Sequence, residues 1–413
     1  MRLISIRTNR GDVMDSKIKR IEMQLKSNKK KPLSGWQLQE FINNINKGYS
    51  KLDLINEISR LLNLGERPEN IIIINKSYEI NNAYSYLKKS NQIDLNKESM
   101  VEKFYNLGRP ISMYPNEFMK KIEMIFNLYE KLFSLFRANK IHTVPKNRLK
   151  TYINLEFDEA ISVLQEDSYQ ILDAIKNIDK NKVKSLKKHI CEHAKESIES
   201  YRKFKKAIIN IKEFNGLIGK EFKQLNDEEK KLFIYMDKNY YNKFFKEFKR
   251  VDRPIILKYD EKTNKLSIIK KEYMLNEVES ENFLDYKDYS HNSPFVITII
   301  AGIAIVSIAA LLYEGVKQEM LNDKKEKELE SEEEEIDNDI RDTVIALSQS
   351  EDLNQANQVQ NKFLKNKLID VNEKVNKQTK ATLSQNGVMN NGVVIKLEKD
   401  RTNCGNNDNP EIK

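Results

Sequence analysis

The chain has 413 residues, of which 32% are charged and 39% hydrophobic, enough for two or three domains with a sizeable core. Its two cysteines, Cys191 and Cys404, are too few for the disulfide framework of a small secreted domain. The sequence has no GxxxxGK[ST], GxGxxG, GxSxG or CxxC motif, so it gives no support to nucleotide-dependent or common hydrolytic activities.

The net charge of +9 is distributed unevenly along the chain. Residues 314–413 hold 15 Lys/Arg and 21 Asp/Glu, a balance of −6, which leaves +15 on residues 1–313. A basic body suits phosphates or anionic lipid headgroups, although a solvated Lys-rich helical surface explains the same charge and is the favoured interpretation. Abundant Lys, Asn and Ile with scarce Trp, Gly and Pro are typical of an AT-rich genome, as found in large phages and other viruses, some low-GC bacteria and some protozoan parasites.

Residues 1–32 are expected to form a basic arm, with a strand at residues 1–8 and a helix or linker at 17–31. Residues 33–115 predict a small helical subdomain: two short helices interrupted at Gly48, capped by Ser34 and Ser50, then a buried strand at residues 71–74. The helix pair fits a DNA-binding helix-turn-helix, but its second helix has few bases, so an αα-hairpin is favoured.

Residues 116–250 predict four amphipathic helices, beginning at an Asn116 cap and near residues 157, 182 and 226. Because each apolar stripe needs a partner, an antiparallel helical bundle is expected. Residues 251–294 predict a β-hairpin, with strands at 254–259 and 265–269, followed by an acidic linker.

The segment from Phe295 to Tyr313 is nineteen residues long and has no charged residue. A helix of that length covers roughly 28 Å, close to the hydrocarbon thickness of a bilayer, so we expect a transmembrane helix whose sidedness stays open. Small residues three apart, Ala301, Ala304, Ser307 and Ala310, would let another helix approach, and Gly302 also lies within the segment. A buried core helix and a membrane-penetrating segment exposed on demand are the alternatives.

Residues 314–385 predict an acidic, partly helical, coiled-coil-like tail, and residues 386–413 a mostly disordered C-terminus with one strand near 393–397. The expected fold class is therefore mainly α: a helical bundle body with a small β-hairpin, one transmembrane helix and an acidic helical or disordered tail.

One pattern has the form of a metal motif. His189, Glu192 and His193 fit H-x-x-E-H, and on a helix His189 and His193 share a face on which two imidazoles can hold Zn²⁺. The pattern resembles the inverzincin metallopeptidase signature over these five residues only. That resemblance implies a third ligand from a downstream Glu, and nothing singles out Glu272 or Glu277. Histidines on a solvated face are the favoured interpretation.

Aromatic residues alternate with bases in residues 201–206 and 240–250, a pattern that holds single-stranded nucleic acid by stacking and ion pairing. The candidates for a nucleic-acid or anionic surface are Arg202, Lys203, Lys205, Lys206, Lys249 and Arg250. Helical spacing favours the alternative that the rings fill the core while the bases stay solvated.

Together these patterns predict a non-enzymatic, single-pass membrane-anchored structural protein without a cofactor, and its composition suggests a virion or genome-delivery component. The expected partners are the lipid bilayer, other proteins through helical faces and the acidic tail, and a second copy of the chain. The alternatives are a membrane-tethered nucleic-acid binder and, least favoured, a zinc hydrolase.

Overall fold

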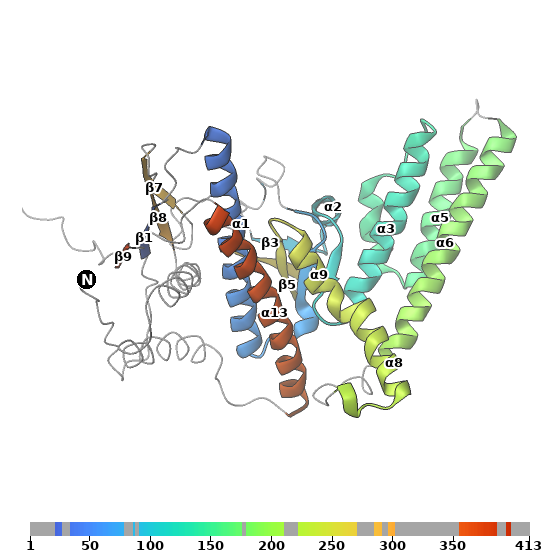
Figure 1. The fold of residues 1–413 in the computed structure, drawn as a ribbon. Coiled ribbons are helices and arrows are strands. Elements are labelled where there is room, and N and C mark those ends of the chain that lie inside the picture. Colours follow the sequence, from blue (N-terminus) through green and yellow to red (C-terminus); the bar gives the residue numbers. More distant parts are fainter. Residues whose placement is uncertain are drawn as a thin grey trace, which may run out of the picture. The chain divides into compact units, whose positions relative to one another are not determined.

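The computed structural model describes residues 21–26, 34–77, 86, 91–175, 179–209, 222–270, 285–290, 296–301, 355–385 and 394–397. These residues are mainly helical and include two antiparallel sheets (Figure 1). They divide between two compact units, one with a four-stranded sheet and the other with a five-stranded sheet and most of the helices.

The four-stranded sheet contains the start of the segment that was expected to cross a membrane. Its strand order is β7 (Asp285–Ser290), β8 (Val296–Ala301), β1 (Ile21–Lys26) and β9 (Val394–Leu397). The helical prediction is therefore wrong for residues 296–301, and the basic helix or linker predicted around β1 is wrong for residues 21–26. Five of the first six residues after Phe295 are β-branched, and such side chains favour a strand once partner strands are present.

One partner of β8 comes from a distant part of the chain, because Ile299 lies opposite Met23 of β1. The other partner is the preceding strand β7, in which Tyr286 lies opposite Ile299. Residues 302–313, with Gly302, Ala304, Ser307 and Tyr313, lie outside the described residues, as do Phe295 and the acidic residues 326–342. Among the described helices, none combines the length and apolar character needed to cross a bilayer.

Helix α1 (Gly35–Asn63) is continuous through Gly48, so the predicted pair of short helices is wrong. Gly48 and Ser50 are buried, and packing around them offsets the cost of about 1 kcal/mol that glycine imposes on a helix interior. The helix ends as expected at Gly65, which has a φ of 82° and donates its N–H to the Leu62 carbonyl. Without a turn between two helices, the helix-turn-helix interpretation no longer applies to this segment.

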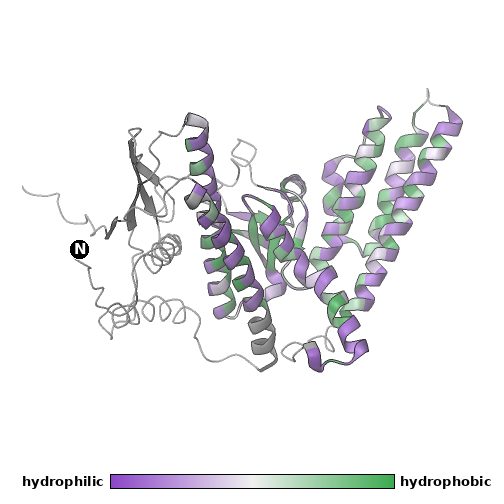
Figure 2. Cartoon of the chain, viewed as in Figure 1, coloured by the Kyte–Doolittle hydropathy of each residue, from purple (hydrophilic) through white to green (hydrophobic). Residues whose placement is uncertain are grey.

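The five-stranded sheet joins segments that the sequence assigned to separate domains. Its order is β3 (Gln92–Asp94), β6 (Lys265–Ile269), β5 (Ile256–Asp260), β2 (Ile71–Ile74) and β4 (Pro110–Ser112). The predicted hairpin is confirmed as β5–β6, and the predicted buried strand is confirmed as β2. All four isoleucines of β2 are fully buried, so both faces of this strand are covered (Figure 2).

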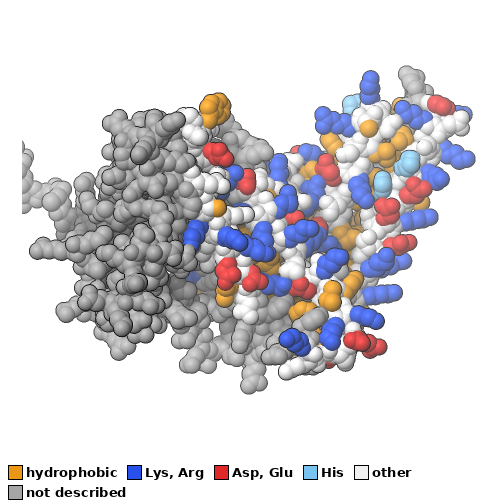
Figure 3. Space-filling model, viewed as in Figure 1, with side chains coloured by type: hydrophobic (Ala, Val, Ile, Leu, Met, Phe, Trp, Pro, Cys, Tyr) orange, Lys and Arg blue, Asp and Glu red, His pale blue; other side chains and the backbone are white. Residues whose placement is uncertain are grey.

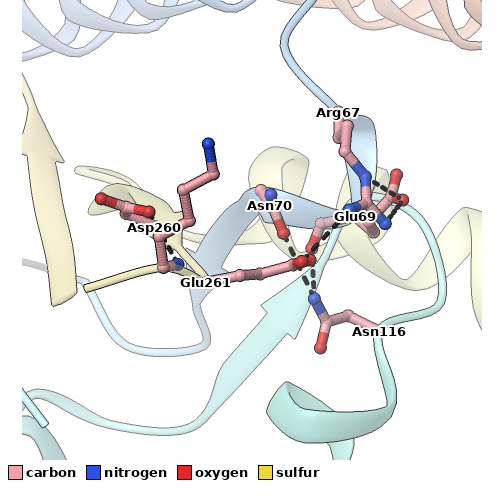
Figure 4. Close-up of polar contacts among 7 residues, drawn as sticks. Arg67, Glu69, Asn70, Asn116, Asp260 and Glu261 are labelled. Carbon is pink, nitrogen blue, oxygen red and sulfur yellow. Dashed lines mark hydrogen bonds and ion pairs between the residues drawn. The ribbon is translucent and has the colours of Figure 1, made fainter. Parts of the chain in front are cut away.

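Asn116 ties the sheet region to the first long helix. Its Oδ1 accepts from the Met119 N–H at 3.0 Å and caps α3 (Glu117–Ala138), as the sequence predicted. Its Nδ2 donates to the Glu69 carbonyl at 3.2 Å, next to Arg67, which forms ion pairs with Glu69 and Glu261 (Figure 4). The acidic residues around this cap are therefore engaged in holding the 3-10 helix η1 (Pro68–Asn70) near the β5–β6 turn.

Helices α3, α5 (Phe157–Asp173) and α6 (Lys180–Ile209) pack against one another, with α2 (Glu98–Leu107), η3 (Lys146–Arg148) and α4 (Leu149–Asn154) beside them. Ion pairs join Asp158 to Arg202 and Asp173 to Lys187, so α5 and α6 run antiparallel. The predicted bundle is present as these three long helices rather than four.

The fourth predicted helix is interrupted. After the capping box of Asn226 and Glu229, α8 (Asp227–Met236) passes through a π-helical turn, η5 (Asp237–Tyr241), into α9 (Asn242–Arg250). Helix α9 packs against β2 and β4, which explains why its three phenylalanines are all buried. The tail prediction of a helix is confirmed by α13 (Gln355–Gln385), whose Leu364, Leu368, Val371 and Val375 are buried at helical spacing.

Candidate anion-binding surface

The bases predicted from the sequence lie on two helices, α6 and α9, and α6 has the larger net positive charge. It holds ten Lys/Arg and three Glu in 30 residues, a net charge of +7. Its apolar side, with Ile190, Ala194, Tyr201 and Phe204, is buried in the bundle core. The charged residues are consequently confined to the sides that remain in water (Figure 3).

Eight of the ten bases of α6 follow one side of the helix. Successive members are separated by intervals that return to the same face of an α-helix, such as the two seven-residue steps from Lys188 through Lys195 to Arg202. We call this set the basic stripe; its members are Lys180, Lys184, Lys187, Lys188, Lys195, Arg202, Lys205 and Lys206. At 1.5 Å per residue it extends over roughly 39 Å.

Four members of the basic stripe have an acidic partner. Lys187 pairs with Asp173 at 2.7 Å, Arg202 with Asp158 at 3.0 Å, and Lys205 with Glu117 at 2.8 Å. Lys188 lies 3.9 Å from Glu192, at the limit of an ion pair. The Glu117 carboxylate raises the pKa of Lys205 above its ordinary value, and accepting from Lys205 lowers the pKa of Glu117.

The other four members, Lys180, Lys184, Lys195 and Lys206, are exposed and have no ion pair with any residue that the structure describes. Lys180 and Lys184 lie in the first two turns of the helix, and Lys206 lies in the last turn. The first turn of α6 has no acidic residue, but Asp179 stands directly before it and accepts from the Asn181 N–H at 3.0 Å. The helix N-terminus therefore has one carboxylate, and the lysines nearest to it gain nothing from the partial positive charge at that end.

The structure separates the six bases that the sequence singled out. Arg202, Lys205 and Lys206 belong to the basic stripe, whereas Lys203 follows Glu196 by seven residues and Glu199 by four, which places it on the acidic side. Lys249 and Arg250 lie at the end of α9, where Arg250 pairs with Glu247 and donates to the Asn75 carbonyl.

The aromatic residues among these bases are part of the core, as the favoured interpretation predicted. Tyr201 is 5% exposed and stacks on Phe157 with ring centroids 4.0 Å apart, while Phe204 lies 5.5 Å from Tyr240. Tyr241, Phe244 and Phe248 are also buried. These rings are therefore unable to stack on the bases of a bound nucleic acid.

The sequence pattern missed Lys184 and Lys195. The bases predicted from the sequence form runs of adjacent residues, such as residues 202–206. Adjacent residues on a helix point in different directions, so such runs do not define one face. The four-residue step from Lys184 to Lys188 and the seven-residue steps from Lys188 through Lys195 to Arg202 are the signal that identifies these two lysines, and it is visible in the sequence once the helix is placed.

His189 and His193 lie on α6 outside the basic stripe, and each is next to a glutamate one turn further on. His189 Nδ1 is 3.4 Å from Glu192, and His193 Nδ1 is 3.4 Å from Glu196, which also pairs with Lys131. No three His, Cys, Asp or Glu residues within the described part of the chain are grouped so as to hold a metal ion. Glu272 and Glu277 lie outside that part.

A second group of charges is buried beneath the bundle surface. Glu123 of α3 accepts from Lys120 at 2.7 Å and from Lys243 of α9 at 2.5 Å. Burial by itself would raise the pKa of Glu123, but the two ammonium groups outweigh it, so the pKa lies below its ordinary value. The Glu123 carboxylate thus joins α3 to α9. Because both of its oxygens accept hydrogen bonds from lysines, it is not available as a general base.

Comparison with protein-family models, with curated proteins and with solved structures finds no match to this chain.

Proposed function

We propose that this protein is a non-enzymatic interaction protein that holds the phosphate backbone of a nucleic acid along the basic stripe of α6. The observation that supports this most is the group of four exposed lysines without an acidic partner among the described residues, Lys180, Lys184, Lys195 and Lys206. A rigid row of ammonium groups roughly 39 Å long matches a regularly spaced polyanion better than a single small ligand.

The position of the lysines supports a role outside folding. Five lysines occupy residues 180–188 near the helix N-terminus, where Asp179 accepts from the Asn181 N–H and Asp173 pairs with Lys187. A phosphate backbone would add negative charge beside the remaining lysines and would release its counterions on binding. The bundle has no need of these charges for its core, which is formed by the opposite side of the helix.

Backbone contact without base reading is the expected mode. Lysine ammonium groups pair with phosphates as point charges, and the rings that lie among the bases of α6, Tyr201 and Phe204, are buried. Affinity should consequently depend strongly on salt and little on nucleotide sequence.

The non-enzymatic part of the proposal rests on how the reactive side chains are used. His189 and His193 each face a glutamate on the same helix, and Glu123 is neutralised by two lysines. These side chains interact with other side chains of the protein, whereas a catalytic acid or base would be placed to contact a substrate.

The test is a fluorescence-anisotropy titration of the full chain with labelled duplex and single-stranded oligonucleotides of two unrelated sequences, over a series of salt concentrations from low to above physiological. The proposal predicts binding at low salt, a linear fall of log K with log salt, and similar affinities for the two sequences. Absence of binding at the lowest salt would overturn it. Binding only to vesicles of anionic lipid would instead assign the stripe to a membrane surface.

Two of the sequence-based expectations remain predictions. Membrane association of the chain, expected from residues 295–313, is tested by carbonate extraction of membranes from expressing cells, where recovery of all the protein in the soluble fraction would count against it. A role in a virion is tested by looking for the protein in purified particles.

A further inference from the structure

Three of the four exposed lysines that have no ion pair with a described residue are evenly spaced along α6. Lys184, Lys195 and Lys206 follow one another at intervals of eleven residues, and α6 is uninterrupted between them (Figure 1). Eleven residues make close to three turns of an α-helix, so these side chains leave the helix in nearly the same direction. Neighbours are roughly 16 Å apart along the axis, and the outer two are roughly 33 Å apart. We call these three residues the spaced lysines.

The two intervals between the spaced lysines contain four more bases of the stripe, and each of these has an acidic partner. Lys187 and Lys188 occupy the first interval, and Arg202 and Lys205 occupy the second. The carboxylates that pair with them are between 49% and 60% exposed, so they would repel a phosphate that came close. Positive charge that is available to an anion therefore recurs every 16 Å or so along α6, roughly once per three turns.

This spacing fits the backbone of a DNA duplex. One turn of a B-form duplex is about 34 Å long, and each strand crosses a line parallel to the duplex axis once per turn. The two strands together cross that line twice per turn, with a groove between the crossings. Because the spaced lysines cover roughly 33 Å, the outer two can reach one strand at the two ends of a turn, and the middle one can reach the other strand.

A single strand fits the same spacing less well. Lying along α6, it would place phosphates beside the whole stripe, including the two intervals in which carboxylates are exposed. Its charge density is also lower, so each phosphate that a lysine neutralises adds about 0.7 to the salt slope, compared with about 0.9 for a duplex. The chain should therefore prefer a duplex to a single strand of the same length.

We propose that α6 lies along a DNA duplex, with Lys184 and Lys206 on the backbone of one strand, one turn of the duplex apart, and Lys195 on the backbone of the other strand. This inference rests on the function proposed above and adds to it the class of nucleic acid and its direction along α6. Lys180 precedes Lys184 by one turn of α6 and contacts the same part of the duplex.

The experiment measures the fluorescence anisotropy of labelled DNA with the full chain, over a series of salt concentrations. The DNA is a set of duplexes from about 6 to about 16 base pairs, each closed by the same short hairpin loop so that the short ones stay paired, and a single strand is compared at each length. At 3.4 Å per base pair, about 7 base pairs cover the distance from Lys180 to Lys195, and about 12 are needed to include Lys206.

In the wild type, the slope of log K against log salt should become steeper by about 0.9 between about 8 and about 12 base pairs, because Lys206 then gains a phosphate. Lys206→Gln should bind the short duplexes like the wild type and should lose this step. Lys195→Gln should have a slope that is lower by about 0.9 at every length and should keep the step. Lys203→Gln removes an exposed base from another side of α6 and, as the control, should match the wild type.

A step of equal size in Lys206→Gln and the wild type would overturn the inference, as would equal affinity for the duplex and the single strand. In both cases the chain would still bind nucleic acid, so the function proposed for the basic stripe would stand. Absence of binding to every one of these DNAs at the lowest salt would overturn both, and the two failures are therefore distinguishable.

Discussion

Lys243 of α9 places its Nζ 2.5 Å from Oε1 of Glu123 on α3, across 120 residues of sequence. Lys120 occupies the other carboxylate oxygen at 2.7 Å. The Glu123 side chain is only 9% exposed, so its charge is tolerated because two ammonium groups surround it. This contact fixes the segment after the π-helical turn against the bundle.

Glu123→Gln should lower the free energy of unfolding by about 1–3 kcal/mol, because it leaves the partly buried ammonium groups of Lys120 and Lys243 without a carboxylate. Urea denaturation followed by far-UV circular dichroism measures the change. Glu166→Gln is the matched control on an exposed position in the interior of α5 and should stay within about 0.5 kcal/mol of the wild type. Equal stability of the two variants would show that the buried contact is not important for folding.

The same contact predicts a pH dependence. The pKa of Glu123 is lower in the folded protein than its ordinary value of 4.5, so the folded state holds fewer protons on this group than the unfolded state. Its contribution to stability is therefore fully present above about pH 4.5 and is lost as the pH falls through the folded pKa. The stability difference between wild type and Glu123→Gln should be constant between about pH 5 and pH 7 and shrink below that range.

Several elements were predictable because their signals are local. The Asn116 cap, the β5–β6 hairpin and the run of four isoleucines in β2 each depend on residues close together in sequence. The strand β8 was not predictable in this way, because an uncharged β-branched run fits a strand as well as a helix until its partners β1 and β7 are known. Continuity of α1 through Gly48 likewise depends on packing that no short pattern encodes.

The candidate surface likewise contains some residues that a local sequence signal identifies and others that only the fold identifies. Arg202, Lys205 and Lys206 were identifiable from the sequence, and the burial of Tyr201 and Phe204 follows from helical spacing. Lys184 and Lys195 belong to no run of adjacent bases, so they are recognised only once the helix is placed.

Gly108→Ala should be strongly destabilising. Gly108 has a φ of 139°, and a Cβ placed there would lie 2.7 Å from Cγ2 of the buried Ile74. Backbone strain and this clash together predict a decrease of about 1–3 kcal/mol or more in the free energy of unfolding. Gly35→Ala is the control, because a Cβ at that position meets no atom within 4 Å. If both substitutions lowered the unfolding temperature equally, the tight packing of Gly108 against β2 would be contradicted.

Binding of a phosphate backbone by the basic stripe is tested most directly by comparing two double variants in oligonucleotide binding over a series of salt concentrations. Lys184→Gln/Lys195→Gln removes two exposed members of the basic stripe, while Lys182→Gln/Lys203→Gln removes the same charge from other sides of α6. The account predicts that the first variant weakens binding and lowers the slope of log K against log salt by up to about 1.8, since each phosphate that a lysine neutralises adds roughly 0.9 to that slope. It predicts wild-type behaviour for the second variant. Equal weakening in the two variants would contradict it, because binding would then follow net charge alone and not the basic stripe.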